Sequence, residues 1–116
     1  MKYIFSILLL FNLLNAFFAQ EQGVDILRGK IIDETGLGLP MAEVFVKDQP
    51  ELRTRADVEG NYIMRLQDGE YYLVFQAMGY EPREIFVAVK EGENIKNIQL
   101  ETKQKAQIRE QRESKG

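Results

Sequence analysis

The chain of 116 residues contains no cysteine, no histidine and no tryptophan. Without cysteine it has no disulfide, no thiolate nucleophile and no cysteine-ligated zinc or iron–sulfur site. Without histidine it lacks the side chain that most often acts as a general base near neutral pH and as a nitrogen ligand to metals. A serine–histidine–aspartate triad is excluded as well. We therefore expect no catalytic residues and no resident cofactor, and an enzyme is the least favoured class of function.

The chain also has no excess of positive charge, with 15 Lys and Arg against 18 Asp and Glu. Such a balance does not draw a protein to nucleic acid, so no nucleic-acid partner is expected. Acidic residues outnumber basic ones up to residue 100, and basic residues outnumber acidic ones from 101 to 116. The sequence therefore describes an acidic domain followed by a basic tail.

The first twenty residues have the layout of a secretory signal peptide. Lys2 gives a positive start, residues 4–14 form an apolar run, and Ala19 is a small residue just before a polar segment. We expect a signal peptide at residues 1–19, cut after Ala19. The protein would then be exported, and the mature domain would be soluble. A retained transmembrane anchor is less favoured, because a spanning helix needs about 20 apolar residues.

The rest of the chain alternates short β-prone runs with turns. Turns every 8–12 residues or so, with no helical period between them, predict an antiparallel β-sandwich over residues 24–101. Asp68 and Gly69 are the strongest hairpin signal, between two of these runs. The seven predicted strands are residues 26–33, 41–47, 52–56, 61–66, 71–75, 84–89 and 95–100.

Residues 102–116 form a charged tail or linker. Ala106 and Ile108 are its only apolar residues, so it can bury little surface to offset the entropy of ordering. It is expected to be either a solvated helix or disordered, and a linker or mobile terminus is favoured.

Turn residues follow one another in a distinctive order along the predicted sandwich. A Gly-x-x-x-Asp stretch precedes a Leu-Pro-Met-Ala-Glu-Val segment, an Asp-x-x-Gly-x-Tyr turn, a Gly-Glu-Tyr-Tyr-Leu strand and a Gly-Tyr turn. In this order, over residues 27–100, the chain resembles the carboxypeptidase regulatory-like (CarboxypepD_reg-like) domain family. Met41 stands where that family often has glycine, and Ala56 where it has threonine. The residues that carry the pattern are Gly29, Asp33, Gly36, Pro40, Asp57, Gly60, Gly69, Gly79 and Tyr80.

The resemblance implies a seven-stranded transthyretin-like or prealbumin-like β-sandwich that is not itself catalytic. The zinc peptidase that gives the family its name needs histidine ligands, which this chain does not have. Similar domains follow the signal peptide of TonB-dependent outer-membrane transporters and of other Gram-negative envelope proteins. The resemblance thus implies an accessory or interaction module in the periplasm or at the outer membrane of a Gram-negative bacterium, with another envelope protein as its partner. In the transporters a plug and a barrel follow, so the chain is either free-standing or part of a longer protein.

The residues agree with that interpretation. Glycines at 29, 60, 69 and 79 suit turns, bulges or close backbone approach, and Asp57 suits a turn in which a carboxylate caps backbone N–H groups. The side chains expected to fill the interior are Tyr62, Tyr71, Leu73 and Phe75.

Two other functions rest on side chains rather than on the fold. The carboxylates of Asp33, Glu34, Asp57 and Glu59 would bind calcium if they met at one end of the sandwich. Turn-forming roles are favoured over this calcium-dependent structural role, because no complete calcium loop is present. An acid–base pair among the same residues is weaker still, since nothing places them across a cleft.

The tyrosines raise the possibility of carbohydrate binding. Tyr71, Tyr72 and Tyr80 would form an aromatic platform if they were exposed together. However, one of Tyr71 and Tyr72 must face outward in any alternating strand, so ordinary roles are favoured. An outward aromatic pair in a shallow groove would favour the carbohydrate-binding alternative. The leading hypothesis remains a non-catalytic module that contacts another protein through its end loops or through a sheet edge that accepts a strand.

Overall fold

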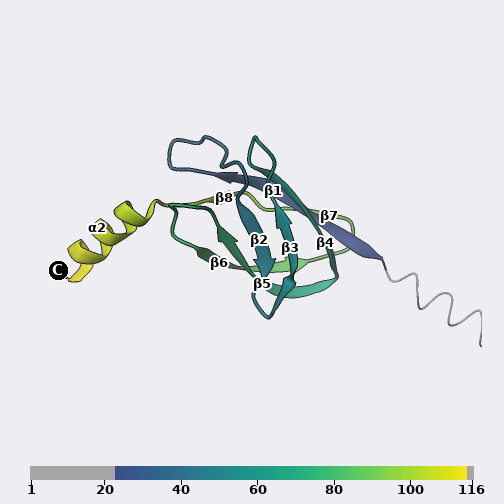
Figure 1. Ribbon diagram of the computed structural model, residues 1–116. Coiled ribbons are helices and arrows are strands. Elements are labelled where there is room, and N and C mark those ends of the chain that lie inside the picture. The colour runs from purple at the N-terminus through teal and green to yellow at the C-terminus, as the bar shows by residue number, and fades with distance from the viewer. Residues whose placement is uncertain (1–22, 115–116) are drawn as a thin grey trace, which may run out of the picture.

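The computed structural model describes residues 23–114, and the predicted signal peptide at 1–19 lies outside them. Within this part of the chain, no helix is long and apolar enough to cross a membrane. Figure 1 shows a sandwich of short strands, with one helix projecting from its end. The elements are β1 (Val24–Ile32), β2 (Glu43–Val46), β3 (Gln49–Arg55), β4 (Asn61–Gln67), β5 (Gly69–Gln76), β6 (Arg83–Val89), β7 (Glu93–Ile95), β8 (Ile98–Gln99) and α2 (Lys103–Ser114).

The strands form two four-stranded sheets, which confirms the predicted β-sandwich. One sheet has the order β4–β1–β7, with β8 also paired to β1, and the other has the order β3–β2–β5–β6. The second sheet is antiparallel throughout. In the first, β1 is antiparallel to β4 but parallel to β7 and β8. The expectation of a wholly antiparallel fold is therefore wrong for this sheet.

The last predicted strand, residues 95–100, is divided in two, which gives eight strands instead of seven. Lys96 and Asn97 interrupt it while remaining bonded to β1. The N–H of Lys96 donates to the carbonyl of Arg28 (2.9 Å), and the side chain of Asn97 accepts from the N–H of Lys30 (2.9 Å). Since a side chain takes the place of a backbone partner at Asn97, the ladder is broken there and resumes at β8.

Asp68 and Gly69 do not form the predicted hairpin. They connect β4 to β5, which lie in different sheets, so the chain crosses here from one layer to the other. Apolar and polar residues alternate in both strands. The apolar side chains of β4 and β5 can pack against each other only if the two strands lie on opposite sides of the core. The edge-to-face contact of Tyr62 with Phe75, with ring centroids 5.6 Å apart, joins the two sheets in this way.

The core lies between the sheets and contains the interior residues predicted from the alternation. Tyr62, Leu73 and Phe75 are fully buried. Tyr71 lies at the border of the core, and its hydroxyl donates to the carbonyl of Gln67 (2.7 Å) beside the crossing. The burial of the large side chains Leu27, Ile31, Val44 and Leu100 completes the packing.

Of the two structures expected for the tail, the helix is present over Lys103–Ser114. The preference for a linker or mobile terminus is corrected for these residues, because the start of the helix is attached to the sandwich. Thr102 pairs with Tyr80 in an isolated β-bridge, and its hydroxyl accepts from the N–H of Lys105 as a helix cap (3.2 Å). Ala106 is only 2% exposed, so the first turns of α2 pack against the domain.

Candidate interaction surfaces

The carboxylates considered for calcium binding are engaged in turn structure. Oδ1 of Asp33 accepts from the hydroxyl and the N–H of Thr35 (2.6 and 2.8 Å) and from the N–H of Leu37 (3.1 Å). The Thr35 hydroxyl, together with these N–H groups, holds the pKa of the Asp33 carboxyl below its usual range. Oδ1 of Asp57 accepts in the same way from the N–H groups of Glu59 and Asn61, both at 2.9 Å.

These contacts are the turn-capping roles that the sequence favoured. Among residues 23–114, no three acidic side chains are grouped so as to hold a metal ion. The calcium-binding alternative therefore draws no support from these residues.

Two glycines, Gly38 and Gly60, allow two loops to meet at that end. A Cβ at Gly38 would lie 1.8 Å from the carbonyl oxygen of Glu59, and Gly60 has a φ of +85°. The loop that carries Gly36 and Pro40 therefore packs directly on the turn that begins at Asp57. Gly69 of the family pattern lies elsewhere, at the crossing between β4 and β5.

The Gly79–Tyr80 turn receives the start of the helix. Gly79 has a φ of +86°, and its carbonyl accepts from the N–H of Lys103 (3.1 Å). Tyr80 donates its N–H to the carbonyl of Ala77 (3.0 Å), which closes the turn. Gly79 and Tyr80 thus belong to the junction between sandwich and tail, and their role is positional.

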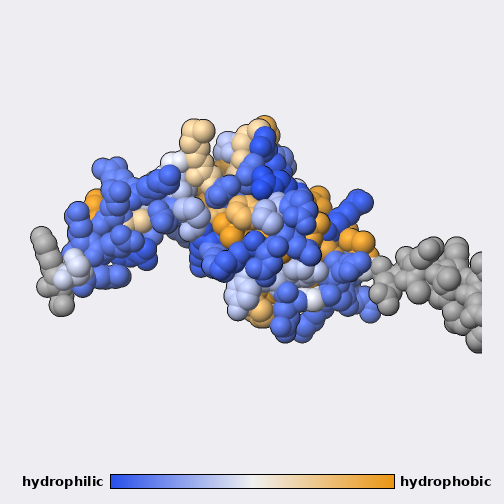
Figure 2. Space-filling model, turned by 60° about the horizontal axis from the view of Figure 1, so that its bottom comes forward, coloured by the Kyte–Doolittle hydropathy of each residue, from blue (hydrophilic) through white to orange (hydrophobic). Residues whose placement is uncertain are grey.

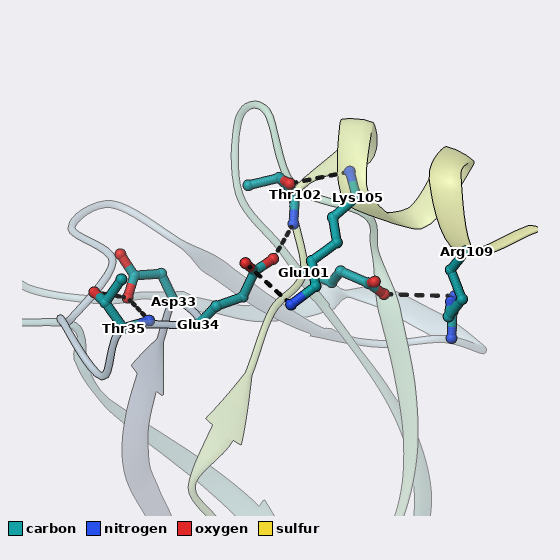
Figure 3. Close-up of polar contacts among 7 residues, drawn as sticks. All are labelled: Asp33, Glu34, Thr35, Glu101, Thr102, Lys105 and Arg109. Carbon is teal, nitrogen blue, oxygen red and sulfur yellow. Dashed lines mark hydrogen bonds and ion pairs between the residues drawn. The ribbon is translucent and has the colours of Figure 1, made fainter.

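Ion pairs complete this junction (Figure 3). Glu34 accepts from the N–H of Thr102 (3.2 Å) and pairs with Lys105 (3.4 Å), while Glu101 pairs with Arg109 (3.4 Å). The acidic domain and the basic tail seen in the sequence therefore meet here. The pairs are partly exposed, so each contributes at most about 1 kcal/mol. Between them and the start of β6 lies an open polar groove of about 420 Å³.

Met41 has a backbone conformation that favours glycine. Its φ is +64°, and it is the only non-glycine residue among those described with a positive φ. An L-residue with a side chain is strained in this conformation by about 1–2 kcal/mol. A glycine, which the family often has at this position, would adopt this φ without strain.

A buried carboxylate at the opposite end was missed from the sequence. Oδ1 of Asp25 accepts from the N–H of Gly92 (3.0 Å), which ties the start of β1 to the turn before β7. Its other oxygen is buried with no hydrogen-bond partner among residues 23–114. The alternating pattern alone did not distinguish this inward aspartate from an exposed one.

The outer face of the second sheet carries an exposed aromatic pair. Tyr72 faces outward, as one of the two adjacent tyrosines had to, and Phe86 lies opposite it on β6. Each is 51% exposed, and their ring centroids are 5.3 Å apart with the planes inclined at 60°. Sequence reasoning missed Phe86, although its position in an alternating run indicated an outward side chain. Figure 2 shows hydrophobic side chains reaching the surface of the sandwich, while the helix is almost wholly hydrophilic.

The two edges of the second sheet differ in protection. Edge strand β3 (QPELRTR) contains Pro50 and three charged residues, and the guanidinium groups of Arg53 and Arg55 pair with Glu43. Proline and charge are the usual means by which a sheet edge avoids pairing with another chain. Edge strand β6 (REIFVAV) ends in five consecutive apolar residues and has neither protection in that stretch. The open edge of the sheet is therefore β6.

Solved structures resemble the chain in fold. A chain of 3-chlorocatechol 1,2-dioxygenase from Rhodococcus opacus 1CP is 13% identical with a TM-score of 0.56, over 71% of this chain and 61% of that one. A chain of a type II cohesin–X-dockerin complex from Acetivibrio cellulolyticus is 16% identical with a TM-score of 0.57, over 66% and 56%. The major pilin subunit BcpA of Bacillus cereus is 17% identical with a TM-score of 0.54, over 66% and 28%.

At these identities the likeness concerns the fold alone, and this chain spans less than two thirds of each of those chains. No curated protein matches the sequence. The family model of the CarboxypepD_reg-like domain matches residues 27–111, which include nearly all of the sandwich and most of helix α2. The chain therefore belongs to the CarboxypepD_reg-like domain family, whose members are non-catalytic domains.

Proposed function

We propose that the protein is an exported, non-catalytic interaction module of the bacterial cell envelope, and that it binds a protein partner by adding a strand at the edge of β6. The signal peptide predicted at residues 1–19 supports export. Membership of the CarboxypepD_reg-like family supports an accessory role. Association with a TonB-dependent outer-membrane transporter is the specific case that the family resemblance suggests.

The observation that carries the proposal is the unprotected edge of β6. Partners that add a strand obtain affinity from main-chain hydrogen bonds and specificity from the side chains next to them. At β6 such a strand would lie beside the exposed ring of Phe86. The edge of β3 is a natural internal comparison, because it ends the same sheet but carries proline and charge.

Site-specific photocrosslinking in living cells tests the proposal. A photoreactive amino acid replaces Ala88 on β6 or, as the matched control, Arg53 on β3, both of which are exposed edge positions. We expect adducts with another envelope protein from position 88 and none above background from position 53. Mass spectrometry of the adduct identifies the partner and shows whether it is a TonB-dependent transporter. Equal labelling from both positions, or none from either, contradicts the proposal.

Carbohydrate binding is a second candidate, favoured by the exposed Tyr72–Phe86 pair. Aromatic rings bind the apolar faces of sugars. Since the two ring planes are inclined at 60°, only one of them at a time presents its flat face to a ligand. A glycan array with the wild-type protein and Tyr72→Ala tests this function. Reproducible binding that is lost in the variant would support it, and an array without signal would exclude it for the glycans tested.

A further inference from the structure

We propose that a second copy of this chain pairs with β6, so that two sandwiches join through antiparallel β6 strands about a two-fold axis at Val87. This inference rests on the open edge used in the proposed function and names an occupant for it. It follows from the direction of the backbone groups of β6 and from the order of charges along the strand.

The backbone direction is fixed by one hydrogen bond in the neighbouring strand pair. The N–H of Lys47 donates to the carbonyl of Tyr72 (2.8 Å), so the backbone groups of Tyr72 point toward β2. Because these groups alternate sides along a strand, those of Tyr71 and Leu73 point toward β6. Their register partners are Val87 and Ile85, which therefore bond to β5.

It follows that the backbone N–H and C=O groups of Glu84, Phe86 and Ala88 point away from β5, to the open side. Among residues 23–114 no further strand pairs with β6 on that side. The open row ends at Lys90, where the side chain of Asn94 holds both backbone groups. Asn94 accepts from the N–H of Lys90 (3.1 Å) and donates to its carbonyl (2.9 Å). The edge therefore offers unpaired backbone groups only from Glu84 to Ala88, which is enough to pair with one short strand.

The charges along β6 are complementary to themselves in antiparallel order. Arg83 and Glu84 precede the five apolar residues, and Lys90 and Glu91 follow them. When two copies pair about Val87, Glu84 of one copy comes opposite Lys90 of the other, the first residue after β6. Residues directly opposite each other point to the same face, so these two opposite charges attract. The two-fold symmetry produces this pair twice.

The register about Val87 also places the free backbone groups of one copy opposite those of the other. Phe86 of one copy lies opposite Ala88 of the other, and both have N–H and C=O groups on the open side. They exchange hydrogen bonds on both sides of the axis, while the two Phe86 rings become diagonal neighbours at a separation that aromatic side chains can bridge. A register about Phe86 would instead place Glu84 opposite Ala88 and would lose the Glu84–Lys90 ion pair. The charge pattern therefore selects the register about Val87.

Glu84 has one carboxylate oxygen in use already. Its Oε1 pairs with Lys47 of the same copy (2.9 Å), and the side chain is 42% exposed. Its Oε2 remains for Lys90 of the second copy. An interface of this kind uses the same strand on both partners, so it closes on itself as a dimer and does not propagate into a filament.

Charge reversal tests the pairing. The full chain, processed by its host and then purified, is studied by analytical ultracentrifugation, and circular dichroism checks that each variant is folded. We expect a dimer whose dissociation constant rises at least about tenfold in Glu84→Lys and in Lys90→Glu, since each creates like-charge contacts twice. An equimolar mixture of the two variants restores every pair, so it should dimerise more tightly than either variant alone.

Ala88→Pro is the backbone test. It removes an N–H from the open side only, and proline is tolerated where the N–H of an edge strand faces solvent. The variant should be folded and monomeric. A monomeric wild-type chain at millimolar concentration, a mixture that dimerises no better than the single variants, or a dimer that persists in Ala88→Pro would each overturn the proposal.

The result separates this inference from the proposed function. A dimer without crosslinks to any other envelope protein supports the self-pairing and contradicts the proposed partner. A monomer that crosslinks another envelope protein from position 88 supports the proposed partner and contradicts the self-pairing.

Discussion

Gly29 lies directly against the backbone carbonyl of Lys96, and a Cβ at Gly29 would lie 1.9 Å from that oxygen. The same carbonyl accepts a hydrogen bond from the hydroxyl of Tyr62 (2.7 Å), and the N–H of Lys96 donates to Arg28 (2.9 Å). The missing side chain at Gly29 thus allows β1, β4 and the link between β7 and β8 to meet. The glycine of the family pattern is required here by packing, and not by a turn.

Gly29→Ala should strongly destabilise the protein. The new methyl group would overlap a backbone atom that cannot move aside like the end of a flexible side chain. We expect the free energy of unfolding to fall by about 2–4 kcal/mol, as for overpacked core sites. Urea denaturation followed by circular dichroism measures it. Gly23→Ala is the control, because no atom lies within 4 Å of its Cβ, and equal effects of the two variants would contradict the explanation.

Met41→Gly should stabilise the protein. Its φ of +64° strains any residue with a Cβ, and its side chain is 59% exposed, so little burial is lost. Relief of about 1–2 kcal/mol is partly offset by the greater freedom of glycine in the unfolded chain, which leaves a gain of about 0.5–1 kcal/mol. That corresponds to several degrees in the melting temperature of a small domain. Met41→Ala keeps the strain and should show no gain, so equal stability of the two variants would be the contrary result.

The alternation of apolar residues was enough to predict the sandwich and its inner rows, because side chains in a strand alternate between two faces. It was not enough for the crossing at Asp68 and Gly69. A tight turn between two strands of one sheet and a crossing between two sheets use the same local residues. Which one forms depends on the strands that pair with β4 and β5, and those are β1, β2 and β6 from distant parts of the sequence.

The candidate surfaces were predictable to a similar extent. The caps at Asp33 and Asp57 are local hydrogen bonds, so the sequence indicated them directly. The outward position of Tyr72 followed from its neighbour Tyr71. The partnership of Tyr72 with Phe86, and the place of β6 at the open edge, depend on strand order. No spacing along the chain contains that information.

The attachment of helix α2 should depend on Ala106. A helix of 12 residues is marginal by itself in water, and Ala106 is its one buried residue. Ala106→Asp should detach the helix and speed tryptic cleavage in the tail, while leaving the melting of the sandwich nearly unchanged. Gln107→Asp, at an exposed position, is the control. Equal cleavage rates in the two variants would show that Ala106 does not hold the helix. The tryptic cleavage sites within α2 are Lys103, Lys105, Arg109 and Arg112.

Tyr62 should make the stability of the protein depend on pH in the alkaline range. Tyr62 is only 1% exposed, and its hydroxyl donates to the carbonyl of Lys96. Burial raises the pKa of this hydroxyl. In the unfolded chain the hydroxyl titrates near pH 10 or so. Below that pH it is protonated in both states and contributes no pH dependence. Above it the unfolded chain loses the proton while the folded chain retains it, so the free energy of unfolding falls as pH rises.

Tyr62→Phe separates this effect from the other groups that titrate at high pH. At pH 7 the variant loses one buried hydrogen bond and leaves the Lys96 carbonyl without it, so we expect it to be less stable by about 1–2 kcal/mol. Above about pH 10 the wild type should lose as much as ~1.4 kcal/mol per pH unit through this single proton, a loss that the variant does not share. The difference between the two proteins should therefore shrink as pH rises above about 10 and should approach zero near pH 11 or so. Urea denaturation from pH 7 to 11 measures it, and a constant difference across that range would mean that Tyr62 ionises as readily in the folded protein as in the unfolded chain.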